Sequence, residues 1–295
     1  MPLAPDDNQN EEEEKRVRHK RNYQVWGSEK QFFLFGGRLR VVKAGPMSIA
    51  TFMAILLPAI LFAIFDASWC WHNIHPSAVI IFYYCWLIGL SSFIKASTSD
   101  PGVIPRNIHI TDDPYDLPED YFNTISLPSG PEGDLKVDVR YCQTCHNWRM
   151  PRTFHCAKCD SCISIHDHHC KWLNNCVGER NYRFFFVFLL FSVIFCFYGG
   201  AMCYYRILQH DQHVRHIPMT VFNIVYLHMA MLYPLLLLIY HISTYAIKTY
   251  PFSLNSIIKN FVYGVGKPRG WSYVRPRDKY NRGDMRFTRF TSGKL

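Results

Sequence analysis

Four long apolar blocks alternate with polar segments along this chain, and each block is long enough to form a helix that crosses a bilayer. About 20 apolar residues suffice for such a helix. No block contains Asp, Glu, Lys or Arg. One such block would also fit a buried core helix of a water-soluble protein, but four favour an α-helical integral membrane protein with four transmembrane helices. The blocks are Pro46–Phe65, Pro76–Ile94, Phe184–Tyr205 and Thr220–Ile242.

The basic residues indicate which ends of these helices face the cytosol. Of the 32 Lys and Arg residues, nine precede the first block, ten lie in residues 95–183 and eleven follow the last block. The segment 66–75 contains no Lys or Arg, and the segment 206–219 contains two. Because Lys and Arg accumulate on the cytoplasmic side of membrane spans, we expect both termini and the loop 95–183 to be cytosolic. The net charge of +9 then reflects topology and contact with anionic membrane lipid, not nucleic-acid binding.

The polar segments divide the chain into regions. Aromatic residues and glycines at 32–37 predict a turn at the membrane surface, and the proline-rich, acidic residues 100–135 predict an extended linker. We expect a cytosolic N-terminal region, two helices, a cytosolic loop with a zinc-binding cysteine-rich domain, two further helices and a cytosolic tail. These regions are 1–45, 46–94, 95–183 (with the domain core at 140–183), 184–242 and 243–295.

Seven of the eleven cysteines lie within residues 142–176. A cytosolic location is reducing, so this clustering favours metal binding over disulfides. Two interleaved sets of three Cys and one His have the same spacing, and each ligand of the second set lies fourteen residues after its counterpart in the first. Each set fits a tetrahedral, structural Zn²⁺ site that supports folding. The predicted ligands are Cys142, Cys145, His155 and Cys162 for the first ion, and Cys156, Cys159, His169 and Cys176 for the second.

One cysteine of this block, Cys170, is left over by the two ligand sets. His169 is assigned to metal, so His168 is free to accept a proton from Cys170, and Asp167 can orient His168. This is the combination of nucleophile, base and orienting group used in covalent catalysis. The alternative is that Cys170 is an idle cysteine or an alternate metal ligand.

The run Asp167–Cys170 (Asp-His-His-Cys), inside this cysteine-rich frame, resembles the DHHC family of protein S-acyltransferases, or palmitoyltransferases. The Asp-Pro-Gly sequence at 100–102, just after the second block, also matches that family. The stretches 33–43, 99–109 and 180–185 are most similar to the fungal Ras palmitoyltransferases within it.

This resemblance implies a two-step reaction. Cys170 is acylated from palmitoyl-CoA, with His168 as the base and Asp167 as its partner, and the acyl group then passes to a cysteine of a cytosolic-face protein. The resemblance also implies two structural Zn²⁺ ions, prenylated Ras proteins as substrates and a small accessory subunit. It suggests the endoplasmic reticulum membrane as the location, with the Golgi membrane as the alternative.

Several basic residues near the cysteine-rich block have two equally plausible roles. They would suit the phosphates of CoA, but they also fit the ordinary excess of positive charge on the cytosolic side of a membrane protein. The sequence does not distinguish these roles. The residues are Arg149, Arg152, Lys171, Arg180 and Arg183.

The chain departs from the family pattern after the fourth block. The family usually carries a Thr-Thr-x-Glu motif there, whereas residues 243–250 read Ser-Thr-Tyr-Ala-Ile-Lys-Thr-Tyr and no Glu follows Ile242. Relative to the family pattern, a segment is missing between Tyr245 and Pro251. Either a gene-model or splice deletion removed it, or this is a natural enzyme that positions its active loop without the motif. Residues 259–261 resemble a family element in which an Asn and an aromatic residue pack on the membrane domain.

Two functions of other classes compete with acyl transfer. A membrane-anchored zinc-binding interaction module, like a ubiquitin ligase, would need no free nucleophile at Cys170. A transporter would use the metal region as a gate, but the apolar blocks lack the charged residues that ion pathways usually contain.

Overall fold

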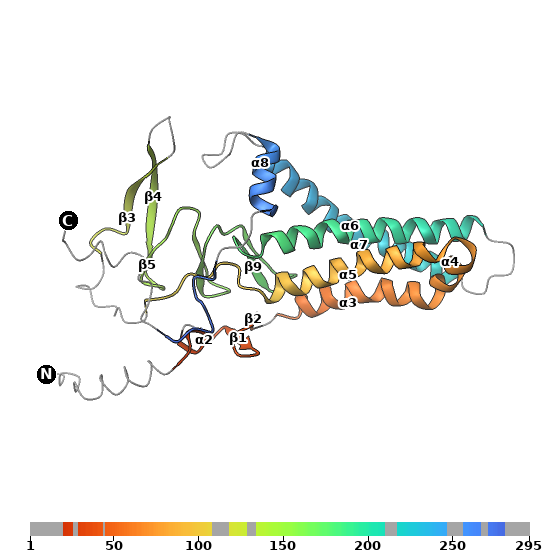
Figure 1. Cartoon of the computed structure of the whole chain (residues 1–295), viewed down its shortest axis with the longest axis horizontal. Coiled ribbons are helices and arrows are strands. Elements are labelled where there is room, and N and C mark those ends of the chain that lie inside the picture. The colour runs from red at the N-terminus through yellow and green to blue at the C-terminus, as the bar shows by residue number, and fades with distance from the viewer. Residues whose placement is uncertain are drawn as a thin grey trace.

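The structure, a computed structural model, describes residues 20–25, 29–43, 45–107, 118–128, 134–209, 217–246, 256–266 and 271–280. Within these ranges, four helices are long and apolar enough to cross a membrane, as predicted. They run side by side as one bundle, and the cysteine-rich region lies beyond one end of it (Figure 1). The four spans are Met47–Asn73, Pro76–Thr98, Tyr182–Leu208 and Ile217–Thr244.

The first span changes its helical geometry along its length. Pro58 lies inside its first segment, and a proline removes one backbone donor from a helix. A π-helical turn follows shortly after it and brings Asp66 to the bundle interior, where the residue is 0% exposed. The segments of this span are α3 (Met47–Leu61), η1 (Phe62–Asp66) and α4 (Ala67–Asn73).

The other three spans are single helices, and the third packs against both the second and the fourth. The second begins at Pro76, where the missing N–H costs nothing, and the preceding His75 side chain accepts a hydrogen bond from the Ser77 N–H. Aromatic rings fill the bundle interior, with Phe62 and Phe82 only 4.2 Å apart between ring centroids. These helices are α5 (Pro76–Thr98), α6 (Tyr182–Leu208) and α7 (Ile217–Ala246).

All four spans extend beyond the predicted apolar blocks, and the added turns include Asp66 in the first span and Arg206 in the third. Asp66 and Arg206 are both buried, and Arg206 Nη1 lies 2.7 Å from Asp66 Oδ1. The Thr220 hydroxyl donates to the same oxygen at 2.6 Å. This buried polar cluster ties the first, third and fourth spans at the end near α4, opposite the cysteine-rich region (Figure 1). The two charges are paired with each other, so they give no support to an ion pathway.

The predicted turn at 32–37 proves to be part of an antiparallel hairpin, with residues 32–34 in its first strand and 35–37 in the connection. Strands β1 (Gln31–Leu34) and β2 (Leu39–Val42) pair with Phe33 opposite Arg40. Phe35, Gly36 and Gly37 all have positive φ angles, which glycine adopts readily, and this allows the tight reversal.

The predicted linker at 100–135 is also more ordered than expected over the part that the structure describes. The Asp100 carboxylate accepts hydrogen bonds from the N–H groups of Gly102 and Val103, at 2.9 and 2.8 Å, which fixes a turn directly after α5. Strand β3 (Phe122–Pro128) then pairs along its whole length with β4 (Asp134–Cys142).

Segments from both ends of the described chain lie next to the cysteine-rich region. The Asn22 side chain, in α2 (Asn22–Val25), donates to the Val274 carbonyl at 2.9 Å. Near the C-terminus, α8 (Ile257–Phe261) precedes a π-helical turn, η2 (Val262–Gly266). The Phe261 ring contacts Phe186 of α6 at 5.4 Å, so the aromatic residue of this element packs on the membrane domain, as predicted.

Candidate active site and metal clusters

Short hairpins build the cysteine-rich region. In two of them a Cys-x-x-Cys pair reaches the turn, and the next residue, His146 or Asp160, has a positive φ angle that reverses the chain. The middle hairpin contributes ligands to both clusters, so the two sites are interleaved. The strands are β5 (Asn147–Trp148), which pairs with β4, then β6 (Phe154–Cys156) with β7 (Ser161–Ile163), and β8 (His168–Cys170) with β9 (Asn175–Val177).

The eight predicted metal ligands meet in two groups of four, and within each group the ligand atoms all lie within 4.8 Å of one another. The three sulfurs of the first group lie 3.4–3.9 Å from His155 Nδ1, and those of the second lie 3.5–3.6 Å from His169 Nδ1. A tetrahedral Zn²⁺ with ordinary bond lengths separates its nitrogen and sulfur ligands by about 3.5 Å. Both groups can therefore hold a metal ion, and their donor sets and spacings fit zinc.

The alternation of side chains along β8 separates the second metal cluster from Cys170. Successive residues of a strand point to opposite faces. His169 pairs with Cys176 across the hairpin and faces the metal cluster. His168 and Cys170 share the other face, and the interaction with the Cys170 side chain contributes to raising the pKa of His168. The structure thus places the predicted nucleophile and base together, away from the metal ligands.

Asp167 lies next to this pair. Its Oδ2 is 2.6 Å from His168 Nδ1, and its backbone N–H donates to the Val177 carbonyl at 2.9 Å. Burial lowers the pKa of His168, but its hydrogen bonds to Asp167 and Cys170 outweigh burial and raise the pKa to about 9. Burial raises the pKa of Asp167, yet the contacts with His168 prevail and hold that pKa below its usual value. The carboxylate and the imidazolium therefore stabilise each other.

Two residues that the sequence did not single out complete the surroundings of His168. His241 of α7 is 3% exposed, and its Nδ1 shares a hydrogen bond of 2.9 Å with the Tyr182 hydroxyl. The ring of Phe185 lies edge-on to both His168 and His241, at 5.4 and 5.1 Å between centroids. The third and fourth spans therefore each contribute a ring to the surroundings of His168.

Cys170 sits where the cysteine-rich region meets the bundle. It is 5% exposed and belongs to an apolar cluster with residues of the second and third spans, including Phe93, Phe185 and Leu189. An apolar group attached to its sulfur would face the membrane-spanning helices rather than water. The site thus combines a nucleophile, a base and an apolar surface.

Buried amide side chains bind this hairpin to the end of α5. Asn175, directly opposite Cys170, donates to the Ala96 and Ser99 carbonyls at 3.0 and 2.9 Å. Its Oδ1 accepts a hydrogen bond of 2.8 Å from Arg40 of β2. Asn181 also donates to Ala96, at 3.1 Å, and to Cys176, at 2.8 Å. No sequence motif marks Asn175, because its partner Ala96 lies 79 positions earlier.

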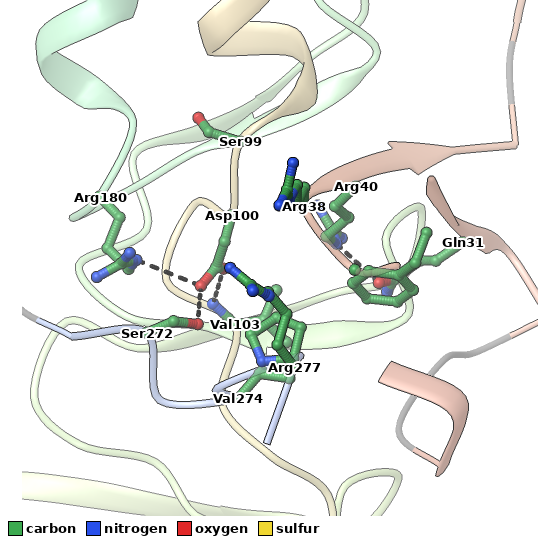
Figure 2. A pocket seen from close by; sticks show the side chains of 13 residues that line it. Gln31, Arg38, Arg40, Ser99, Asp100, Val103, Arg180, Ser272, Val274 and Arg277 are labelled. Carbon is green, nitrogen blue, oxygen red and sulfur yellow. Dashed lines mark hydrogen bonds and ion pairs between the residues drawn. The ribbon is translucent and has the colours of Figure 1, made fainter. Parts of the chain in front are cut away.

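Two of the basic residues considered for CoA contact other groups of the protein. Arg180 pairs with Asp100 at 3.3 Å, and the Arg183 guanidinium lies 5.0 Å from the centre of the Phe184 ring. Asp100 also accepts a 2.5 Å hydrogen bond from Ser272. Figure 2 shows this network at the wall of a cavity of about 320 Å³, into which Arg38 and Arg277 also project.

Comparison with known proteins agrees with this geometry. A family model described as DHHC palmitoyltransferase matches residues 136–257. The chain is 41% identical to Palmitoyltransferase ERF2 of Debaryomyces hansenii over 93% of this chain and 85% of that protein. It is 40% identical to Palmitoyltransferase ERF2 of Kluyveromyces lactis, over 86% and 80%, and 37% identical to that of Saccharomyces cerevisiae, over 86% and 79%.

These matches extend over the membrane helices as well as the cysteine-rich region, so a zinc-binding interaction module without acyl transfer is not favoured. The enzymatic activity is protein S-palmitoylation. The helices long enough to span a bilayer make the protein a multi-pass membrane enzyme. The chain belongs to the DHHC palmitoyltransferase family.

Proposed function

We propose that this enzyme transfers a palmitoyl group from palmitoyl-CoA to protein cysteines through an acyl-enzyme on Cys170. The observation that carries the proposal is the position of Cys170 on the face of β8 opposite the metal ligand His169 and next to His168. The sulfur is thus available for a covalent bond while six other cysteines are gathered in the clusters. The apolar cluster around Cys170 suits the chain of an attached palmitoyl group.

The reaction proceeds in two thioester exchanges. The Cys170 sulfur attacks the carbonyl carbon of palmitoyl-CoA, His168 accepts the thiol proton, and the carbon–sulfur bond to CoA breaks. His168 returns the proton to the departing CoA sulfur. A substrate thiol then repeats the exchange: its sulfur takes the acyl group, and its proton restores the Cys170 thiol through His168. Asp167 stabilises the protonated imidazole at each stage.

The eight Cys and His ligands would hold two structural Zn²⁺ ions. In each cluster four protein ligands complete a tetrahedral set and leave no open position for substrate. Bound zinc would supply folding energy, since strands β5 to β9 of this region have only two or three residues each.

The two termini and the cysteine-rich region would face the cytosol. This topology is supported by the distribution of Lys and Arg and by contacts between the segments. Asn22 and Val274, from opposite ends of the chain, bond to each other beside the cysteine-rich region. An even number of spans is consistent with that arrangement.

The substrates would be prenylated Ras-type proteins at the endoplasmic reticulum membrane, with the Golgi membrane as the alternative, and a small accessory subunit would assist. A single lipid chain gives only marginal membrane binding, so a prenylated protein gains stable anchoring from a second chain. Membrane-proximal cysteines of such a protein approach the plane in which Cys170 lies.

Labelling of the purified full-length enzyme with radioactive palmitoyl-CoA tests the proposal. We expect an adduct on Cys170 that hydroxylamine releases, as a thioester requires. Cys170→Ser should abolish labelling while retaining two metal ions and the native melting temperature. Cys196→Ser is the matched control, because Cys196 is also buried but lies outside both clusters. Full labelling of the Cys170 variant would refute the assignment.

A further inference from the structure

The β1–β2 hairpin has two faces of different character. Its inner face, formed by Gln31, Phe33, Arg40 and Val42, is turned toward the protein and includes the three buried residues of the two strands. Its outer face is apolar and consists of Phe32, Leu34, Leu39 and Val41, with Phe35 at the tip. Phe32, Leu34 and Phe35 are 51%, 47% and 75% exposed. Strand pairing places Phe32 beside Val41 and Leu34 beside Leu39, so the outer face is continuous.

Hydrogen bonds of the inner face fix the orientation of the hairpin. Gln31 Nε2 donates to the Cys159 carbonyl, and to Ser161 Oγ at 2.8 Å. Arg40 donates to Gln31 at 2.7 Å and to Asn175 at 2.8 Å. Because these bonds are buried, the hairpin cannot rotate to hide its outer face without losing them.

The position of the hairpin points to the partner of the outer face. Strand β2 ends at Val42 and the first span begins at Met47, so at most about 18 Å of extended chain separates them. In Figure 1 the hairpin lies just beyond the start of α3, at the end of the bundle that carries the cysteine-rich region. The outer face is thus close to the level at which the first span enters the bilayer.

The charges around the outer face also fit a lipid surface. Residues 31–43 include Arg38, Arg40 and Lys43 but no acidic residue. Lys43 Nζ lies 5.3 Å from the centre of the Phe32 ring, so its cation sits at the border of the apolar face. Aromatic and aliphatic side chains flanked by Lys and Arg are the composition of segments that lie in the head-group region.

We propose that the outer face of the β1–β2 hairpin inserts into the membrane leaflet next to the cysteine-rich region and binds its phospholipids. The side chains of Phe32, Leu34 and Phe35 occupy the boundary between head groups and acyl chains. Lys43, at the border of this face, meets the phosphates. The rest of the hairpin stays outside the hydrocarbon, where its backbone groups remain paired within the hairpin.

Insertion has a consequence for the reaction, which rests on the proposed role of Cys170. The inner face binds Asn175, the residue opposite Cys170, and the Val42 carbonyl accepts a 2.7 Å hydrogen bond from Asn174. The depth of the hairpin in the leaflet therefore sets the depth of Cys170. A rigid connection of this kind holds the nucleophile at the level where an acyl thioester lies in the head-group plane.

Photocrosslinking of the full-length enzyme in phospholipid nanodiscs tests the insertion without using activity. A benzophenone-bearing phenylalanine replaces Phe35 in one variant and Phe32 in a second, which serves if the first does not fold. The matched control replaces Phe122 of β3, which is 62% exposed and has the Arg140 guanidinium 5.0 Å from its ring centre. Strand β3 also forms a hairpin, with β4, but it lies away from the bundle (Figure 1).

After irradiation, mass spectrometry counts the phospholipid adducts on each variant. We expect about tenfold more lipid adducts at Phe35 and Phe32 than at Phe122, since an apolar side chain in the leaflet is in constant contact with acyl chains. The yield should be higher in nanodiscs that contain anionic lipid. Equal lipid yields at the three positions, or adducts at Phe35 to a protein chain in place of lipid, would overturn the proposal. Because the readout is covalent lipid, it stands even if Cys170 proves not to be the nucleophile.

Discussion

The two adjacent histidines of the Asp167–Cys170 run have different surroundings because a strand turns successive side chains to opposite faces. His169 points to the metal cluster, and His168 points to Cys170 and the spans. The sequence predicted this division of roles from the spacing of the ligands. It did not predict His241 and Tyr182, because a buried histidine in an apolar helix carries no motif and its neighbours come from a distant part of the chain.

Substitution of the two histidines separates their roles. His168→Ala should slow acyl-enzyme formation by about 10²–10⁴-fold, the usual effect of losing a general base, and leave the metal content unchanged. His169→Ala should release metal and increase protease sensitivity, because it removes a ligand whose binding also stabilises the fold. Single-turnover labelling and elemental analysis of both variants provide the test. Equal metal loss would mean that the two assignments are exchanged.

The Tyr182–His241 hydrogen bond predicts a smaller effect at the same site. Tyr182→Phe removes the hydroxyl and leaves His241 Nδ1 buried without that partner, at a cost of about 1–3 kcal/mol. We expect a lower melting temperature and slower acylation, with unchanged metal content. The matched control is Tyr240→Phe, because the Tyr240 ring also contacts His241, at 5.2 Å, while its side chain is 60% exposed. Identical behaviour of the two variants would contradict this reading of the contact.

At the level of elements, hydropathy and ligand spacing were the basis of the predictions that the structure confirms. The four spans and the two clusters depend on local patterns, so the sequence reveals them directly. The hairpins and the ordered segment after α5 depend on contacts between distant residues. Asn175, for example, binds the Ala96 carbonyl 79 positions earlier, and such a contact has no local signature. The sequence did not predict the turn at Asp100, because the many proline and acidic residues of 100–135 favoured an extended linker.

Close packing between these elements yields a prediction at Gly178, which follows β9. A Cβ atom there would lie 2.7 Å from both Ile163 Cγ2 and the Pro101 carbonyl oxygen, so Gly178→Ala must displace backbone. We expect destabilisation of about 1–3 kcal/mol, typical of overpacking. Thermal unfolding in detergent measures it. Gly45→Ala is the control, because no atom lies within 4 Å of the Cβ position there, and an equal loss of stability in both variants would exclude the steric explanation.

On the scale of the whole molecule, the structure joins a membrane bundle to a region assembled from three parts of the chain. Residues near Asn22, the cysteine-rich loop and the segment around Val274 contact one another at one end of the bundle. The interval from 247 to 255, where the expected Thr-Thr-x-Glu motif is missing, lies outside the described residues. Its effect on activity therefore stays a prediction.

We expect the chain as written to acylate more weakly than relatives that carry the motif, although its spans and metal clusters are complete. Insertion of a Thr-Thr-x-Glu segment after Ala246 should raise turnover without changing metal content. An insertion of equal length with Ala-Ala-x-Ala controls for spacing. The comparison is a side-by-side turnover assay with an intact relative. Equal activity of the uninserted chain and that relative would show that the motif is dispensable here.

The ion pair between Asp66 and Arg206 also has a consequence for how the protein is made. The two residues are 140 positions apart, and at about 5–20 residues per second the ribosome needs about 7 to 28 s to synthesise the intervening chain. During that interval the first span carries an acidic side chain that no later helix can yet neutralise, at a cost in lipid of up to about 3.5 kcal/mol. Asp66 accepts its other short hydrogen bond from Thr220, which emerges later still. The first helix to be inserted is therefore among the last to reach its final packing. The bundle closes at this end only once its third and fourth helices have left the ribosome.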